Sequence, residues 1–342
     1  MLHKLTALIL SLALLLCGCT LPEKEPPKKQ YQATFLTLFD TVTYISGLAE
    51  SEEAFQQQAQ QIHDRLLVYH QLFDIYNDYE GLSNLKTVND NAGVAPVVVD
   101  AIIIRFLTDC KAYYALTGHT VNVAMGSVLS LWHEARTEGI NDPASAALPD
   151  PQALEEASLH TGWENVVIDT DASTVYLSDP LLRLDVGAVA KGWAVQQVAG
   201  SAPQGLLISV GGNVCATGPK DDSGTPWVVG ITDPDGGEYL HTLNITDLAI
   251  VTSGDYQRYY VVDGKAYHHI IDPETRMPAH RWRSVTIACR DSGLADALST
   301  ALFLLPQEEG QELLTQCDAE AMWLDAQGNR YYSPGFRELI RT

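Results

Sequence analysis

The chain has 342 residues, of which 46% are hydrophobic and 19% are charged, which is the composition of a globular protein able to bury a substantial core. Its formal net charge at pH 7 is −22, from 43 acidic and 21 basic side chains. This charge argues against binding nucleic acid or an anionic membrane surface through a basic patch, because the long-range field repels polyanions. An anionic ligand would need a local cation or a well-placed lysine.

The N-terminal segment has the pattern of an export signal followed by a tether. Lys4 precedes the apolar run 5–16, which is too short to span a bilayer but typical of a signal core. The following Leu16-Cys17-Gly18-Cys19 resembles a bacterial lipobox. We therefore predict a lipoprotein signal peptide over 1–18, a lipidated Cys19, and a Pro- and charge-rich tether over 19–33. This places the protein at the cell membrane, lipid-anchored on the extracytoplasmic face; an uncleaved signal anchor is the alternative.

The first half of the remaining chain is predicted to be mainly helical. Ser51 is a plausible N-cap, followed by two acidic residues and a core-facing apolar pattern. Asp100 and the Asp150-Pro151 pair give further helix starts, and Gly118 gives a helix end. The elements expected here are a strand within 31–46, helices over 51–73, 100–118 and 122–135, a turn-rich segment over 77–93, and a short helix from 150.

The second half is rich in strand patterns, and Asp263-Gly264 predicts a hairpin turn. Strands are expected over 166–169, 174–177, 206–210, 227–232, 248–252, 259–262, 285–289 and 321–324, and helices over 189–198, 293–305 and 307–317. There is no internal repeat and no clear interdomain linker. The predicted fold of residues 34–342 is therefore a single α+β unit, of one or two lobes, in which helices flank mixed or antiparallel strands.

Cysteines are too scattered to form a zinc site. Cys110, Cys215, Cys289 and Cys317 lack Cys-x-x-Cys spacing. Export would permit disulfides, but isolated buried thiols are the favoured interpretation.

Three glycine-containing stretches could bind phosphate groups. In residues 184–193, Gly187 and Lys191 lie at a predicted strand-to-helix junction, where exposed helix N–H groups favour phosphate oxygens. Paired glycines within 209–213 end another strand, and Ser253 and Gly254 end a third. A plain cap or a tight turn is the alternative interpretation of each stretch.

Two further stretches carry acid–base and metal-ligating groups. His268 and His269 precede Asp272, which sets potential general bases beside an acid. Asp296 and Thr300 lie four residues apart on one helix face, and their oxygens suit a hard cation such as Mg²⁺. A helix-start acid and a surface hydroxyl are the alternative for this last pair.

These five stretches contain segments that resemble the signature blocks of the ApbE family, the FAD:protein FMN transferases. They occur along the chain in the order of those blocks. The blocks are 185–192, 210–213, 252–256, 269–275 and 295–300, with weaker likeness at 38–41 and 118–132. The resemblance implies that residues 34–342 form an ApbE-like domain. It further implies an enzyme that splits FAD in the presence of Mg²⁺, releases AMP and joins FMN through a phosphoester to a threonine of an exported or membrane-bound acceptor protein.

The resemblance also implies roles for individual residues. Mg²⁺ would be held by the main-chain oxygen of Ala188 and by Asp296 and Thr300, and the catalytic residues would be His269 and Asp296. The residues expected to contact FAD are Phe39, Tyr76, Thr120, Val121, Asn122, Asp185, Lys191, Ser253, Gly254 and Ile271.

Three positions depart from the family pattern. Arg276 stands where a glycine usually follows Asp-Pro-x-Thr, Phe39-Asp40-Thr41 replaces Met-Gly-Thr, and Asn122 replaces an aspartate. None is a proposed metal ligand. The first two put local FAD contacts in question rather than the reaction.

Two other functions remain open from the sequence: a Mg²⁺-dependent FAD pyrophosphatase that yields FMN and AMP, and a non-catalytic flavin-binding lipoprotein.

Self-modification is not expected. The family's acceptor motif resembles Asp-Gly-Ser/Ala-Thr-Gly, and neither Asp222-Ser-Gly-Thr225 nor Asp235-Gly-Gly-Glu238 matches it.

Overall fold

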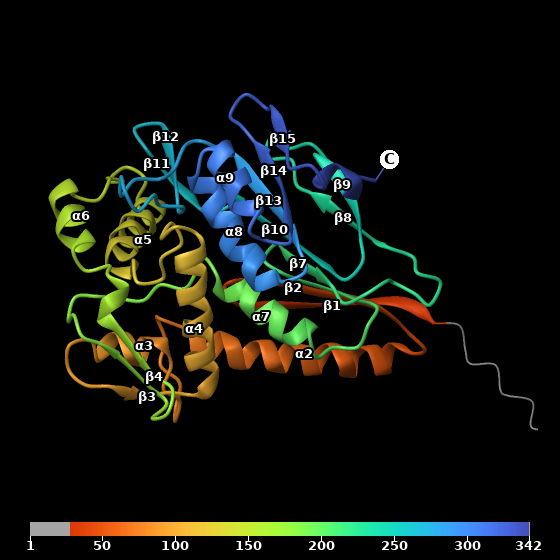
Figure 1. The fold of residues 1–342 in the computed structure, drawn as a ribbon, viewed down its shortest axis with the longest axis horizontal. Coiled ribbons are helices and arrows are strands. Elements are labelled where there is room, and N and C mark those ends of the chain that lie inside the picture. The colour runs from red at the N-terminus through yellow and green to blue at the C-terminus, as the bar shows by residue number, and fades with distance from the viewer. Residues whose placement is uncertain (1–27, 342) are drawn as a thin grey trace, which may run out of the picture.

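An eight-stranded antiparallel sheet forms the centre of the computed structural model, which describes residues 28–341 (Figure 1). The predicted signal peptide, Cys19 and most of the tether lie outside the described residues. In spatial order the strands are β1 (Lys29–Leu38), β2 (Thr41–Ala49), β6 (Leu206–Val210), β7 (Asn213–Ala216), β10 (Leu248–Gly254), β13 (Ser284–Cys289), β14 (Ala319–Leu324) and β15 (Arg330–Tyr332). All neighbouring strands pair antiparallel, which confirms the predicted α+β class.

Each face of this sheet is covered by a different layer because side chains alternate along its strands. On β13, Val285 and Ile287 join the main core, whereas Ala288 joins a second core. The main core lies under α2 (Glu52–Phe73), α7 (Ala190–Ala199), α8 (Ser292–Leu304) and α9 (Gln307–Leu314). The second core lies under the β8 (Trp227–Ile231) and β9 (His241–Ile245) hairpin and the 3-10 helix η2 (Phe336–Leu339).

The rest of the chain forms smaller units beside the sheet (Figure 1). One contains α3 (Leu85–Asp90), α4 (Ala101–Leu116), η1 (Trp163–Asn165) and the strands β3 (Val97–Val98), β4 (Val166–Asp169) and β5 (Thr174–Leu177). Another packs α5 (Gly126–Asn141) and α6 (Pro151–Ser158) with β11 (Tyr259–Val262) and β12 (Lys265–His268) around a third core. Among the described residues no helix is long and apolar enough to cross a bilayer.

Several predicted boundaries are confirmed, and their caps explain why. The Ser51 hydroxyl accepts a hydrogen bond from the Ala54 N–H at 3.2 Å, and the carboxylates of Asp100 and Asp150 cap α4 and α6. The predicted turn at Asp263-Gly264 joins β11 to β12, with φ of 50° and 77° at its two residues. Cys110, Cys215 and Cys289 are buried, unpaired thiols, as expected, whereas the unpaired Cys317 is only partly buried.

Other predictions were wrong in detail. The segment 31–46 contains two strands rather than one, because the chain reverses at Phe39-Asp40, where both residues have a φ of 52° without any glycine to signal the turn. The turn-rich segment 77–93 contains α3, which begins with a capping box between Asn84 and Thr87. The helix expected from residue 122 begins at Gly126. The strands β3, β7, β9 and β15 were not predicted.

Candidate active site

A cavity of about 690 Å³ lies where the β1–β2 turn, the start of α7, the end of β10 and helix α5 meet. It gathers residues from all the predicted blocks. The predicted site residues that line it are Phe39, Tyr76, Thr120, Val121, Asn122, Asp185, Ala188, Lys191, Ser253, His269, Ile271, Asp296 and Thr300. Gly254 does not line the cavity, and Cys19 lies outside the described residues.

The carboxylate of Asp296 is held where α7 packs against α8. Its Oδ2 accepts hydrogen bonds from the Gly192 N–H at 2.8 Å and from Asn213 Nδ2 at 2.9 Å, and Lys191 Nζ lies 4.0 Å away. Asp296 is only 5% exposed. Burial raises the pKa of Asp296, while Lys191, the Gly192 N–H and Asn213 act in the opposite direction.

Gly192 is required at this helix contact. A Cβ at this position would lie 2.3 Å from the Ser292 carbonyl oxygen and 2.4 Å from the Cβ of Asp296. The absence of a side chain therefore lets the backbone of α7 reach the carboxylate on α8.

Three oxygens remain available at this end of the cavity. Gly192 lies in the first turn of α7, where backbone N–H groups have no partner within the helix, and its N–H donates to Asp296. No N–H or O–H of the described residues donates to the Ala188 carbonyl, to Asp296 Oδ1 or to the Thr300 hydroxyl. One carboxylate, one carbonyl and one hydroxyl suit a hard cation that keeps several waters. Within residues 28–341 no cluster of three or more His, Cys, Asp or Glu side chains offers another metal site.

The loop before α7 is stabilised by its own acid. Asp185 Oδ1 accepts from the Gly187 N–H at 2.9 Å, and Lys191 Nζ donates to the Gly187 carbonyl at 3.3 Å. The segment before this loop is not a regular strand, since only a bridge between Arg183 and Met125 forms there. The predicted strand-to-helix junction is therefore a loop-to-helix junction.

Ser253 and Gly254 differ in position. The Ser299 hydroxyl donates to the Asp296 carbonyl at 2.8 Å, so the Ser253 hydroxyl donates to Ser299 at 2.8 Å and keeps its lone pairs for the cavity. Gly254 is buried, and a Cβ there would lie 2.4 Å from the Tyr256 ring. The position of Gly254 indicates a packing role rather than contact with a ligand.

The two neighbouring histidines have different environments. His268 is buried, donates through Nε2 to the Ala279 carbonyl and accepts at Nδ1 from the Ile270 N–H, so both ring nitrogens are occupied. His269 is half-buried in the cavity wall, and its Nδ1 lies 3.2 Å from the Arg258 carbonyl oxygen. Asp272 accepts backbone hydrogen bonds from Glu274 and Thr275 and does not line the cavity.

The protonation state of His269 follows from these contacts. Burial lowers the pKa of His269 to about 3, with Arg258 as the next cause. The ring is therefore neutral near pH 7. Because a carbonyl only accepts, Nδ1 carries the proton and Nε2 carries a lone pair.

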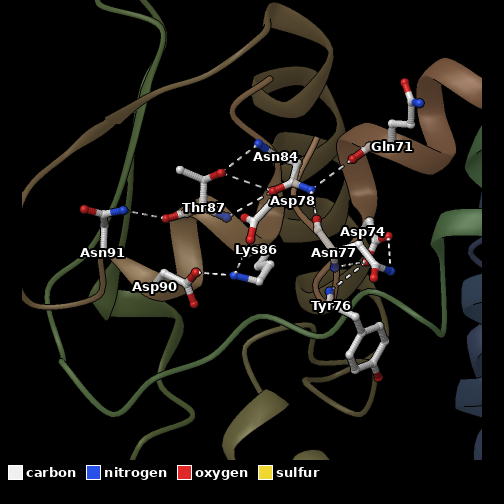
Figure 2. A network of polar contacts seen from close by, with 10 residues as sticks. All are labelled: Gln71, Asp74, Tyr76, Asn77, Asp78, Asn84, Lys86, Thr87, Asp90 and Asn91. Atoms are coloured by element: carbon white, nitrogen blue, oxygen red, sulfur yellow. Dashed lines mark hydrogen bonds and ion pairs between the residues drawn. The ribbon is translucent and has the colours of Figure 1, made fainter. Parts of the chain in front are cut away.

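A hydrogen-bonded loop positions Tyr76 at the cavity (Figure 2). The Asp74 carboxylate accepts from the Tyr76 N–H at 2.7 Å, from the Asn77 N–H at 3.0 Å, from Asn77 Nδ2 and from the Tyr79 hydroxyl. Asn84 ties the loop to α2 by donating to the carbonyls of Gln71 and Asn77. Burial raises the pKa of Asp74, but these hydrogen bonds outweigh it, and the net pKa is lowered.

Thr120, Val121 and Asn122 all line the cavity. The Asn122 amide donates to the Thr161 carbonyl and accepts from the Ala124 N–H, both at 2.9 Å. The Thr120 hydroxyl donates to the Thr117 carbonyl. The polar groups of both side chains therefore already have protein partners.

Two of the departures from the family pattern lie in left-handed backbone. Asp40 and Arg276 have φ of 52° and 60°, a region where glycine is unstrained and other residues are not. The Arg276 carbonyl accepts from the Trp132 indole at 2.9 Å, and the Phe39 N–H donates to His70 Nδ1 at 3.3 Å. The chain therefore keeps these turns without the glycine.

Sequence reasoning missed several cavity residues. Asn213 belongs to a recognised block but was given no role. His133 and Arg136 lie three residues apart on α5, a spacing that could have paired them. Arg258 lies two residues after the 252–256 block but was not counted in it. The His133 ring stacks on Tyr76 with centroids 5.2 Å apart, and Arg136 donates to His133 Nδ1 at 3.0 Å.

The chain is similar to known proteins over most of its length. The ApbE family model matches residues 36–323. An FAD:protein FMN transferase from Treponema pallidum is 36% identical over 253 residues, which are 68% of this chain and 68% of that protein. An FAD:protein FMN transferase from Vibrio cholerae is 30% identical over 311 residues, which are 87% of this chain and 86% of that protein. The crystal structure of the ApbE protein from Thermotoga maritima has a TM-score of 0.80 and 29% identity, over 92% of this chain and all of that one. This chain belongs to the ApbE family.

Proposed function

We propose that this protein is an enzyme that transfers FMN from FAD to a threonine hydroxyl of an exported acceptor protein and releases AMP. The observation that carries the proposal is the gathering of Ala188, Asp296, Thr300, Lys191 and a neutral His269 around one cavity. Relatives named FAD:protein FMN transferase support the same reaction.

Mg²⁺ fits the oxygen set of Ala188, Asp296 and Thr300. The fit rests on two features: the Ala188 carbonyl, just before the N-cap of α7, receives no backbone hydrogen bond, and Asp296 presents one oxygen without a protein hydrogen bond. Bound there, the cation would neutralise the pyrophosphate and stabilise charge on the AMP leaving group.

The protein's own groups position FAD and move the proton. Lys191 supplies a positive charge beside the buried carboxylate, and Tyr76 offers an aromatic surface for a ring of FAD. The Nε2 lone pair of neutral His269 accepts the proton of the incoming hydroxyl. The hydroxyl oxygen then bonds to the FMN phosphorus, the phosphoanhydride bond breaks, and AMP leaves with the electron pair.

Attachment to the membrane is part of the proposal. The lipobox-like Cys19 and the tether would hold the catalytic domain on the extracytoplasmic face, where exported acceptors expose their threonines. Cys19→Ala is expected to move the expressed protein from the membrane fraction to the soluble fraction. Protein that stays with the membrane would argue for an uncleaved signal anchor.

The reaction is tested with protein lacking residues 1–27, which keeps every described residue. Incubation with FAD, Mg²⁺ and exported proteins that carry an accessible threonine should give acceptor heavier by one FMN. AMP released at the same rate without acceptor would favour the pyrophosphatase, and intact FAD after long incubation would favour a flavin-binding protein. A stable gain of one FMN on this chain itself would refute a separate acceptor.

A further inference from the structure

Two arginines line the cavity without a carboxylate partner. Arg136 lies on α5, and Arg258 lies immediately before β11. Within residues 28–341 neither guanidinium forms an ion pair. The chain has 43 acidic and only 21 basic side chains, so carboxylates that could pair with these arginines are abundant. Two unpaired guanidiniums in one cavity therefore indicate a ligand that brings its own negative charge.

The fold keeps these two arginines near each other. Helix α5 and strand β11 share the third core, where Trp132 and Tyr260 are both buried. Burial lowers the pKa of the half-buried Arg136, and the positive charge of Arg258 lowers it further. Holding like charges together costs free energy, and an anion bound between them would remove that cost.

Other charged groups extend this positive region along the cavity wall. Burial, then Arg258, His268, Arg136 and Lys191, lower the pKa of His269, and Arg136, Arg258 and Lys191 all line the cavity with it. The carboxylates that line the cavity are Asp40, Asp74, Asp185 and Asp296. Asp74, Asp185 and Asp296 accept hydrogen bonds from other groups, and Asp40 is exposed at the β1–β2 turn.

We propose that Arg136 and Arg258 form a phosphate subsite that binds the pyrophosphate of FAD and makes the cavity prefer FAD to flavins without phosphate. The proposal rests on the proposed function for the identity of the substrate. A guanidinium donates two parallel hydrogen bonds to phosphate oxygens, which a point charge cannot do. The stacked Tyr76 and His133 rings beside Arg136 favour a nucleotide over an acceptor carboxylate, because a nucleotide joins a planar ring to phosphate.

The test measures binding rather than turnover, in EDTA so that no divalent cation contributes. Calorimetry with FAD and with riboflavin is applied to wild type, Arg136→Gln and Arg258→Gln. Each variant should bind FAD about 10-fold more weakly, with a smaller salt dependence, and bind riboflavin within about 2-fold of wild type. Arg290→Gln, an exposed change outside the cavity, is the control and should bind both as wild type does.

Each alternative outcome is distinct. Equal losses for FAD and riboflavin would assign the arginines to the flavin or to structure and overturn the subsite. Unchanged FAD binding with a raised KM for the acceptor would assign them to the acceptor and overturn it too. Arg136→Lys and Arg258→Lys keep the positive charge, so their FAD affinities should lie between those of wild type and the glutamine variants. They replace any glutamine variant that does not fold.

Failure of the proposed function can be told apart from failure of the subsite. Wild-type protein that binds no flavin would refute the proposed function. Inorganic pyrophosphate then serves as the probe of the arginines alone. Pyrophosphate affinity that is equal in wild type and the double glutamine variant would overturn the subsite.

Discussion

The Gly192 N–H donates a 2.8 Å hydrogen bond to the Asp296 carboxylate and so joins the first turn of α7 to α8 at the wall of the cavity. This one bond has two effects. It gives a partner to one of the N–H groups that the start of a helix leaves unpaired, and it holds a buried carboxylate in place. The fixed carboxylate then lies at the same cavity as the Ala188 carbonyl and the Thr300 hydroxyl, which complete the oxygen set proposed to hold Mg²⁺.

Gly192→Ala should separate the two helices. Its Cβ would lie 2.3 Å from the Ser292 carbonyl oxygen, which is backbone and cannot rotate away. We expect the free energy of unfolding in urea to fall by about 2 kcal/mol, as for overpacking elsewhere. Gly200→Ala at the C-terminal end of α7, where a Cβ would meet only the Gln196 carbonyl at 3.3 Å, should change it by less than about 0.5 kcal/mol. Equal effects of the two changes would contradict the role given to Gly192.

Asp74→Asn should loosen the loop that carries Tyr76. The carboxylate accepts four hydrogen bonds, whereas an amide has one acceptor oxygen and would set its NH₂ against other donors. The expected loss of unfolding free energy is about 2 kcal/mol, with weaker FAD binding. Asp78→Asn removes only the ion pair between Lys86 and the Asp78 side chain, which is 74% exposed. This change should therefore have little effect on the unfolding free energy or on FAD affinity. Unchanged FAD affinity in Asp74→Asn would show that the loop does not position the flavin site.

His269 should make the apo protein less stable in acid. Its pKa is about 3 in the folded protein, below the ordinary value of 6.5, so the unfolded chain binds the proton first as the pH falls. The contribution of His269 to the free energy of unfolding is fully present above pH 6.5 and is lost as the pH falls toward 3. The unfolding free energy of wild type should therefore fall relative to His269→Gln by about 1 kcal/mol per pH unit within this window. Parallel pH profiles for the two proteins would show that His269 is not buried in neutral form.

Arg276→Gly tests the strain at the most unusual turn. Arg276 has a φ of 60°, where a side chain costs about 1 kcal/mol, although glycine also gives the unfolded chain more freedom. We expect unfolding free energy to stay the same or to rise by about 0.5 kcal/mol. Arg290→Gly, at a position outside the left-handed region, should instead lower it by about 0.5–1 kcal/mol. A larger loss at Arg276 than at Arg290 would show that the arginine side chain is required there.

The sequence predicted the parts of the site that lie in continuous blocks. Gly187 and Lys191 stood out at a predicted helix start, and Asp296 and Thr300 on one predicted helix face. The roles of Lys191, Asp296 and Thr300 followed from the family resemblance. The structure brings them to one cavity.

What the sequence could not predict depends on contacts between distant segments. The bond from Gly192 to Asp296 spans 104 positions, and Arg136 and Arg258 meet only because α5 packs on β11. The Phe39-Asp40 turn was missed because its residues adopt left-handed backbone without glycine. The family resemblance implied FAD contacts for Asn122, which departs from the pattern, and for Gly254, which fits it. In the structure Asn122 uses its amide to hold its own loop and Gly254 packs against Tyr256.

In the proposed reaction, Asp296 and its neighbouring oxygens support transfer of FMN to an acceptor. The most direct test is intact mass spectrometry of an acceptor protein after incubation with FAD and Mg²⁺, comparing wild type with Asp296→Asn and with the exposed control Asp78→Asn. Asn keeps the shape and can still accept from Gly192, but it removes the charge, so transfer should fall at least about 100-fold while FAD binding in EDTA stays near wild type. Asp78→Asn should label the acceptor as wild type does. Acceptor labelled by Asp296→Asn at the wild-type rate would contradict the account.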